Sequence, residues 1–121
     1  MKYYMNEWMN EIFFKQLNIV NEKLWENEFD LVFSIHVLEQ LPYEAKDAIL
    51  NMIYCSSNIV ILIEPDWNLS NALERLYIIE NDHVRCIFDS IKKLWYEPVE
   101  YYKSHIQSCI YNPSIVTVIK K

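Results

Sequence analysis

The chain has 121 residues, a length that predicts one domain with a single modest core. Hydrophobic residues make up 52% and charged residues 23%, which places the chain among globular rather than disordered proteins. A formal net charge of -6 and a pI near 5.0 argue against a nucleic acid as the main partner, because that binding depends on clustered Lys and Arg.

Cysteine use and hydropathy favour a reduced protein of the cytoplasm. Cys55, Cys86 and Cys109 are widely spaced, so the sequence predicts neither a disulfide framework nor a zinc site, and we expect no other metal site. The N-terminus lacks the uninterrupted apolar core of a signal peptide. The longest aliphatic run, Ile59–Ile63, is far below the ~20 residues that span a bilayer. We therefore expect no export and no membrane span.

The chain contains no glycine, although about 7% is usual. We expect its left-handed turns to be made by Asn or Asp, the other residues that tolerate this conformation. Without glycine, no glycine-rich loop can hold a phosphate or the carboxylate end of a cofactor.

The first 28 residues give two competing patterns. Aromatic and aliphatic residues at helical spacing would place a helix over Met1–Phe14, whereas Phe13–Val20 can also begin a strand. Asn21–Glu28 is polar enough to form a loop.

The next part of the chain alternates strands and helices. Leu31–Phe33 is predicted to be a strand that is buried on both faces. Pro42 precedes a helix over Tyr43–Cys55, and Ile59–Ile63 predicts a central strand. The inward stripe of that helix is predicted to comprise Ala45, Ala48, Ile49, Met52 and Ile53.

The last third ends in two extended segments without a helix between them. Before these, Ser70 or Asn71 caps a helix that runs to about Glu80, with Leu73, Leu76 and Tyr77 turned inward. A short helix over Ser90–Leu94, an extended segment over Val99–Tyr102 and a strand over Ile115–Ile119 follow. This order predicts one α/β unit with a mostly parallel sheet and an antiparallel hairpin at its C-terminal edge.

Three stretches resemble class I S-adenosylmethionine-dependent methyltransferases. FDLVFSIHVLEQLP, residues 29–42, is similar to the family's fourth strand and the loop after it, and NIVILIEPDW, residues 58–67, is similar to its fifth strand. HVRCIFDSIKKLWYEPVEYY, residues 83–102, is similar to the segment that leads into the sixth strand, although Trp95-Tyr96 stands where the family commonly has Gly-Phe. The resemblance implies a Rossmann-like three-layer fragment in which residues 29–121 form the fourth to seventh strands.

The family's first half has no counterpart in this sequence. Only 28 residues precede Phe29, and they carry neither the glycine-rich loop that approaches the cofactor nor the acidic residue that binds the ribose hydroxyls. The Asp near the adenine would correspond at best to Asn18 or Asn21. The domain is therefore interpreted as truncated: a remnant, a non-catalytic partner, or one half of an enzyme completed by another polypeptide.

The resemblance places Ser34, Ile35 and His36 beside S-adenosylmethionine, because ligands of open α/β sheets bind at the carboxyl ends of the strands. Ser34 and His36 can equally cap the helix that follows. Glu64 and Asp66 end the next strand at the same edge. Together with His36, they are the candidate catalytic bases for a protonated methyl acceptor, although the two carboxylates can also solvate a strand end and cap the helix near Ser70.

Other residues are weaker candidates for the functional site. An aromatic acceptor pocket would draw on Trp67, Tyr101, Tyr102 and Tyr111, which can also be core residues. The remaining groups worth testing are Glu39, Gln40, His83, Arg85 and His105.

The sequence thus supports two hypotheses about function. The first is methyl transfer from S-adenosylmethionine to an unknown acceptor, weak or absent in this chain alone. The second is a non-catalytic binding module whose open sheet edge is covered by a second copy or by another subunit, because folded proteins normally cover such edges.

Overall fold

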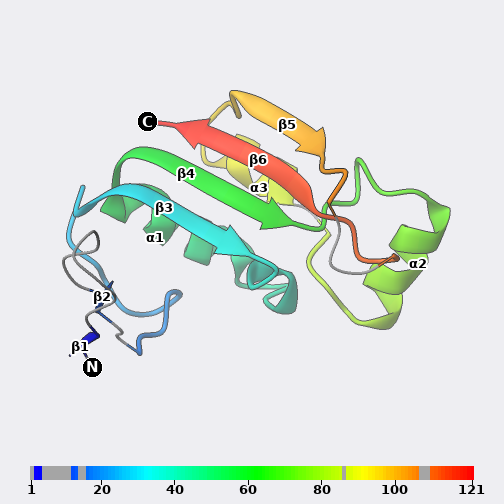
Figure 1. Cartoon of the computed structure of the whole chain (residues 1–121), viewed down its shortest axis with the longest axis horizontal. Coiled ribbons are helices and arrows are strands. Elements are labelled where there is room, and N and C mark those ends of the chain that lie inside the picture. Colours follow the sequence, from blue (N-terminus) through cyan, green and yellow to red (C-terminus); the bar gives the residue numbers. More distant parts are fainter. Residues whose placement is uncertain (1, 4–11, 14–15, 86, 107–109) are drawn as a thin grey trace.

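The structure is a computed structural model that describes residues 2–3, 12–13, 16–85, 87–106 and 110–121 (Figure 1). The elements follow the chain in the order β1 (Lys2–Tyr3), β2 (Ile12–Phe13), β3 (Phe29–Ile35), the 3₁₀ helix η1 (Leu38–Gln40), α1 (Ala45–Cys55), β4 (Ser56–Glu64), α2 (Ala72–Glu80), α3 (Ile87–Lys93), β5 (Glu100–Lys103) and β6 (Ile115–Lys120). This order confirms the mixed α/β class. No helix in the described ranges is long and apolar enough to cross a membrane.

Four strands form the main sheet in the order β3, β4, β6, β5. β3 is parallel to β4, whereas β6 runs antiparallel to both β4 and β5. Three of the four strands therefore point in one direction, and the antiparallel pair of β5 and β6 forms one edge, as predicted. β4 has the central place that its aliphatic run indicates.

One helical layer covers one face of this sheet. α1 and α3 lie behind the strands in Figure 1 and pack against Val60, Leu62 and Ile119. All five residues of the stripe predicted for α1 are buried there, namely Ala45, Ala48, Ile49, Met52 and Ile53. Burying one large aliphatic side chain stabilises a fold by about 1.5–3 kcal/mol. This layer therefore supplies most of the hydrophobic stabilisation in the described part of the chain.

The prediction that β3 is buried on both faces is wrong. β3 is an edge strand, and its residues Leu31 and Phe33 are exposed. Only Val32 and Ser34 turn toward the helical layer. Among the described residues, no strand pairs with the outer edge of β3 and no helix lies over its other side. The described helices thus provide one of the two helical layers that a three-layer sandwich requires.

α2 lies beyond the carboxyl end of β4 rather than under the sheet (Figure 1). Asn71 caps it, because the Asn71 side chain accepts the Glu74 N–H (3.0 Å) and the Glu74 carboxylate accepts the Asn71 N–H (2.7 Å). The predicted inward face is wrong for Leu73 and Leu76, which are exposed, whereas Ile78 is buried. Because α2 lies at the end of the sheet, only a narrow side of this helix is buried.

The N-terminal segment differs from both patterns that the sequence offers. Lys2–Tyr3 and Ile12–Phe13 pair as short antiparallel strands, although a helix was predicted over Met1–Phe14. Residues 16–20 contain no strand, so the alternative over Phe13–Val20 does not form there. The rest of both predictions lies outside the described residues.

Left-handed backbone occurs at Asn27, His36, Asp82 and Trp95, with φ values of 53°, 50°, 48° and 67°. Asn and Asp were expected at such turns, but His36 and Trp95 were not. After α3, the Trp95 N–H donates to the Lys92 carbonyl (3.0 Å) and the Tyr96 N–H to the Ile91 carbonyl (3.3 Å). This is a Schellman ending, in which Trp95 has the position that usually carries glycine.

Candidate functional site

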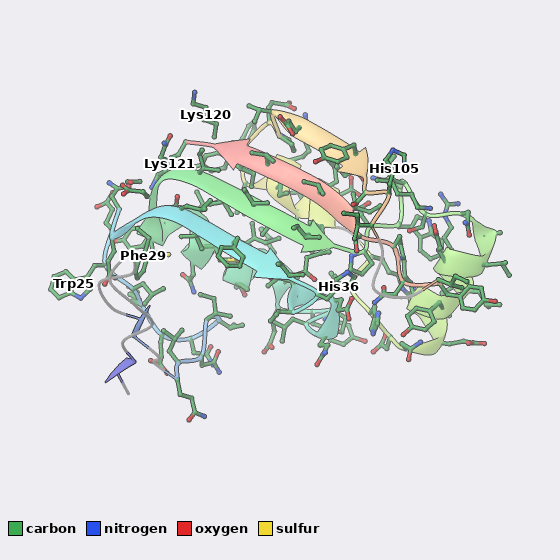
Figure 2. The ribbon with its side chains drawn as sticks, in the orientation of Figure 1. Trp25, Phe29, His36, His105, Lys120 and Lys121 are labelled. Atoms are coloured by element: carbon green, nitrogen blue, oxygen red, sulfur yellow. The ribbon has the colours of Figure 1, made fainter. Side chains whose placement is uncertain are left out.

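The candidate residues lie where β3 and β4 end. Ser34 and Ile35 are the last two residues of β3, and His36 follows them at the carboxyl edge of the sheet (Figure 2). The His36 N–H donates to the Ile63 carbonyl of β4 (2.9 Å). A residue other than glycine in the left-handed region costs roughly 1–2 kcal/mol. Backbone strain of this kind is concentrated at functional sites.

Glu64 is a buried carboxylate that organises the turn after β3. It accepts hydrogen bonds from the Ser34 hydroxyl (2.5 Å) and from the N–H groups of Val37 (3.0 Å), Leu38 (3.1 Å) and Glu39 (3.2 Å). Burial raises the pKa of Glu64, and these four hydrogen bonds offset that effect only in part. Both carboxylate oxygens are therefore engaged within the chain, where they cap the N-terminus of η1.

Asp66 forms its hydrogen bonds in another part of the fold. Its Oδ1 accepts from the Tyr101 hydroxyl (2.9 Å) and the Asn68 N–H (2.9 Å), and its Oδ2 accepts from the Phe88 N–H (2.8 Å) in the first turn of α3. Burial raises the pKa of Asp66, and burial together with the Asp66 charge raises the pKa of Tyr101. Asp66 thus joins β4 to α3 and β5, and its side chain caps α3 rather than the helix near Ser70.

The His36 side chain belongs to a buried polar cluster that includes the start of β6. Its Nδ1 lies 2.8 Å from Glu39 Oε2, and its Nε2 lies 2.8 Å from Ser114 Oγ. Asn112 Nδ2 donates to the same Glu39 oxygen (3.0 Å). A hydroxyl, an imidazole and a carboxylate in this order can activate a nucleophile. Because Ser114 is only 5% exposed, however, the arrangement here fixes the imidazole in place.

His83 approaches this cluster from the loop after α2. Its Nδ1 lies 4.0 Å from Glu39 Oε2. Within the described part of the chain, neither His83 Nδ1 nor Asn112 Oδ1 has a hydrogen-bond partner, although both atoms are buried. Buried polar atoms are nearly always paired, so each exception needs an explanation. The cluster is therefore polar, buried and not fully satisfied.

An apolar groove of about 380 Å³ opens beside the end of β3. Its walls come from Ile19, Val32, Phe33, Ser34, Ile35, Val37, Leu38 and Met52. The Ser34 hydroxyl is the polar side-chain group of this lining, and it already donates to Glu64. The groove is therefore apolar and offers no charged side chain to a ligand.

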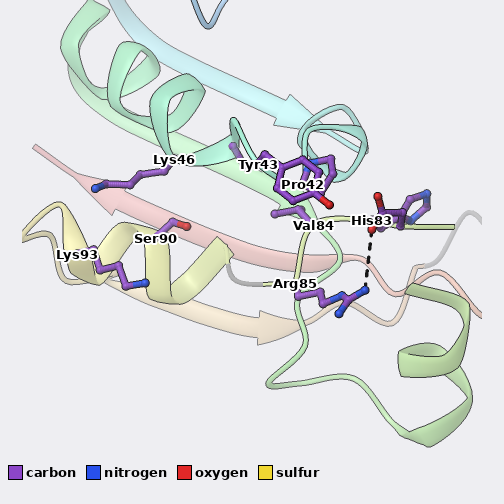
Figure 3. A pocket seen from close by; sticks show the side chains of 10 residues that line it. Pro42, Tyr43, Lys46, His83, Val84, Arg85, Ser90 and Lys93 are labelled. Carbon is purple, nitrogen blue, oxygen red and sulfur yellow. Dashed lines mark ion pairs between the residues drawn. The ribbon is translucent and has the colours of Figure 1, made fainter. Parts of the chain in front are cut away.

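A second groove, of about 390 Å³, lies between α1 and α3 (Figure 3). Three cationic residues line it, Lys46, Arg85 and Lys93, and Arg85 pairs with Asp82 at 3.9 Å. His83 lines it as well, so the groove borders the buried polar cluster. The cationic lining favours anions, but all three cations are exposed and therefore screened by salt.

The four aromatic candidates lie in different surroundings. Arg75 lies over the Trp67 ring at 5.0 Å, and Tyr101 packs against Phe88 with ring centroids 4.4 Å apart. Tyr111 lines a hollow beside α2, and Tyr102 lies on β5 with its side chain half exposed. These contacts fit the structural interpretation of the aromatic residues better than a shared acceptor pocket. His105 is exposed after β5 (Figure 2).

Comparison with known proteins identifies the fold. No protein-family model matches the chain, and no curated protein matches its sequence. The crystal structure of magnesium protoporphyrin IX methyltransferase from Synechocystis PCC 6803 with bound SAH superposes with a TM-score of 0.66 at 13% sequence identity. The chain has a methyltransferase fold. The match covers 95% of this chain and 53% of that enzyme, so the chain spans about half of the enzyme's length.

This methyltransferase fold confirms the Rossmann-like α/β class that the sequence predicts. It also explains why Ser34 and Glu64, 30 residues apart, meet at one edge. Sequence reasoning missed Ser114 and Asn112. A usable signal was present, because a final antiparallel strand must begin at the edge where its parallel neighbours end.

The structure brings two of the five predicted site residues, Ser34 and Glu64, into direct contact and places His36 in the turn beside them. Ile35 faces the open side of β3, and Asp66 bonds elsewhere. In the described ranges, no group of three or more His, Cys, Asp or Glu residues is arranged to hold a metal ion.

Proposed function

We propose that this protein is a methyltransferase-like domain whose chemistry is methyl transfer from S-adenosylmethionine to an acceptor not yet identified. The observation that supports this proposal best is the likeness of 95% of the chain to an enzyme solved with SAH. The candidate residues occupy the carboxyl edge of the sheet, where open α/β folds bind ligands. The setting we propose is the cytoplasm, in keeping with widely spaced cysteines.

The proposed cofactor contacts are Ser34, Ile35 and His36. The apolar groove beside them suits the adenine ring of S-adenosylmethionine, because its lining is almost wholly aliphatic or aromatic. Nothing in this lining complements the charged amino-acid end of the cofactor, and the chain has no glycine-rich loop to do so. We therefore propose that the chain alone binds the cofactor weakly and is weak or inactive as an enzyme.

The proposed catalytic groups are His36, Glu64 and Asp66. S-adenosylmethionine would supply the methyl group, and a base is needed only if the acceptor is protonated. His36 is the first choice for that base, because its side chain is 15% exposed and a carboxylate orients it, whereas Glu64 and Asp66 are buried. Both ring nitrogens of His36 are engaged within the chain, so an acceptor would take the place of the Ser114 hydroxyl at Nε2.

Nuclear magnetic resonance of the ¹⁵N-labelled chain tests the cofactor assignment. SAH is added to about 5 mM, above the ~1 mM dissociation constant that corresponds to about -4 kcal/mol. We expect shifts in the amide signals of residues 33–38. Val37→Glu, which places a charge in the apolar groove, should abolish these shifts, whereas the matched substitution Leu73→Glu on α2 should leave them intact.

His36→Asn tests the imidazole separately from the turn conformation, because Asn removes the ring and tolerates the left-handed backbone that His36 adopts. A loss of the shifts in this variant, with an unchanged far-ultraviolet spectrum, would support a cofactor contact by His36. Absence of any shift in the wild type at about 5 mM SAH would refute the cofactor assignment.

The alternative function is a non-catalytic binding module. The observation that favours it is the outer edge of β3, with which no described strand pairs, together with the exposed apolar side chains on that strand. An open edge and an uncovered apolar surface are both features that partners normally cover.

A further inference from the structure

One face of the main sheet is apolar from strand to strand. Residues directly opposite each other on paired strands share a face. The pairs Leu31 with Ile59, Phe33 with Ile61 and Ile35 with Ile63 therefore point the same way, and so do the pairs of Ile61 with Val118 and Ile63 with Val116. Tyr102 continues the row onto β5 through its pairing with Val116. We call this surface, together with Phe29, the open face.

The open face is the side of the sheet opposite α1 and α3. Figure 1 views the sheet from this side, with α1 and α3 behind the strands, and Figure 2 labels Phe29 at the start of β3. In the part of the chain that the structure describes, no helix crosses it. Five of its large side chains keep about half of their surface in solvent: Phe29 (44%), Leu31 (48%), Phe33 (62%), Ile35 (50%) and Tyr102 (49%).

The size of this surface is sufficient for association between two copies. If a large side chain has about 200 Å² of surface, the exposed parts of these five amount to roughly 500 Å² per copy. Two copies would then bury roughly 1,000 Å², the lower limit for a specific interface. The partly exposed aliphatic residues of β4 and β6 add to this area.

The charges on the open face favour a second copy as the occupant. Its centre carries no charge, so two such faces can meet without burying an unpaired ion. The charged residues are at one end, where Lys120 lies opposite Ile59 and Glu100 lies opposite Val118. One end therefore carries both signs and can meet its own copy without a like-charge contact.

We propose that two copies of this chain pack open face to open face, with Phe33 near the centre of the contact. Two stacked sheets about 10 Å apart are a standard way to bury apolar strand faces. The proposal rests on the binding-module function above and not on methyl transfer. Each copy has a net charge of -6, so long-range repulsion opposes the dimer and added salt should strengthen it.

Sedimentation equilibrium of the wild type and two matched variants tests this proposal. We expect a wild-type dimer whose dissociation constant falls as NaCl is raised. Phe33→Glu should raise that constant at least about 30-fold, the effect of losing one strong contact residue. Leu73→Glu makes the same change at a similarly exposed position (61%) outside the open face and should leave the constant unchanged.

Circular dichroism shows whether each variant is folded, and Leu31→Lys provides a second disruption of opposite charge. A monomeric wild type at high concentration would overturn the proposal. Equal effects of Phe33→Glu and Leu73→Glu would overturn it as well, and so would large aggregates in place of a defined dimer. SAH titration of the Leu31→Lys variant separates the two proposals, because Leu31 belongs to the open face and does not line the apolar groove. Absence of SAH binding in this variant contradicts only the cofactor assignment, whereas SAH binding by a wild type that stays monomeric contradicts only the dimer.

Discussion

The left-handed turn after α3 is a position where one substitution should stabilise the protein. Trp95 has φ 67° and completes the Schellman ending with a side chain that is 96% exposed. The left-handed conformation costs a residue with a Cβ about 1–2 kcal/mol, and glycine avoids this cost. Glycine loses part of that gain, about 0.5–1 kcal/mol, through its greater freedom in the unfolded chain. The lost packing is negligible because the indole contacts little.

We therefore expect Trp95→Gly to raise the free energy of unfolding by about 0.5–1 kcal/mol, which moves the urea midpoint by roughly 0.3–0.5 M. Urea unfolding followed by far-ultraviolet circular dichroism measures this without relying on tryptophan fluorescence, and all samples are compared at one protein concentration. Trp95→Ala is the matched control, since it removes the ring and keeps the Cβ. If Trp95→Gly is no more stable than Trp95→Ala, backbone strain at this turn is not the cause.

Three further predictions concern buried hydrogen bonds and charge. Tyr101→Phe removes the hydroxyl that donates to Asp66 and should lower the free energy of unfolding by about 1–2 kcal/mol, as measured by urea unfolding. Burial raises the pKa of Glu64, so the folded state binds the proton of this carboxyl group more tightly than the unfolded state does. The stabilisation from the bound proton is complete below the unfolded pKa of about 4.3 and is lost as the pH rises through the folded pKa. Between those two pH values, the free energy of unfolding obtained from urea curves should fall less steeply with pH in Glu64→Gln than in the wild type. The Lys121 ammonium binds carbonyl groups at the end of α1, so Lys121→Met should cost about 1 kcal/mol, whereas Lys46→Met at an exposed position on α1 should cost almost nothing.

The parts of the site that sequence reasoning found are those set by strand ends. Ser34 lies next to the last residue of β3 and Glu64 is the last residue of β4, so the sequence places both at one edge of the parallel pair, and the 2.5 Å hydrogen bond between them confirms this. The partner of the His36 imidazole was not found, because Ser114 is 78 residues away and reaches the edge only through the antiparallel return of β6. The role of Asp66 also depended on contacts from α3 and β5.

Local patterns in the sequence were enough to predict β4, the buried stripe of α1 and the cap of α2. Each depends on residues that are close in the chain, such as Asn71 and Glu74, or on a hydrophobic period that one element carries by itself.

The burial of β3 was beyond the reach of such patterns. An apolar strand has the same sequence whether or not a neighbouring layer covers it, and only the assembled sheet reveals that Leu31 and Phe33 face solvent. Burial is a property of what packs against a residue. The sequence therefore determined which side chains are apolar, and the tertiary structure alone decided which of them are buried.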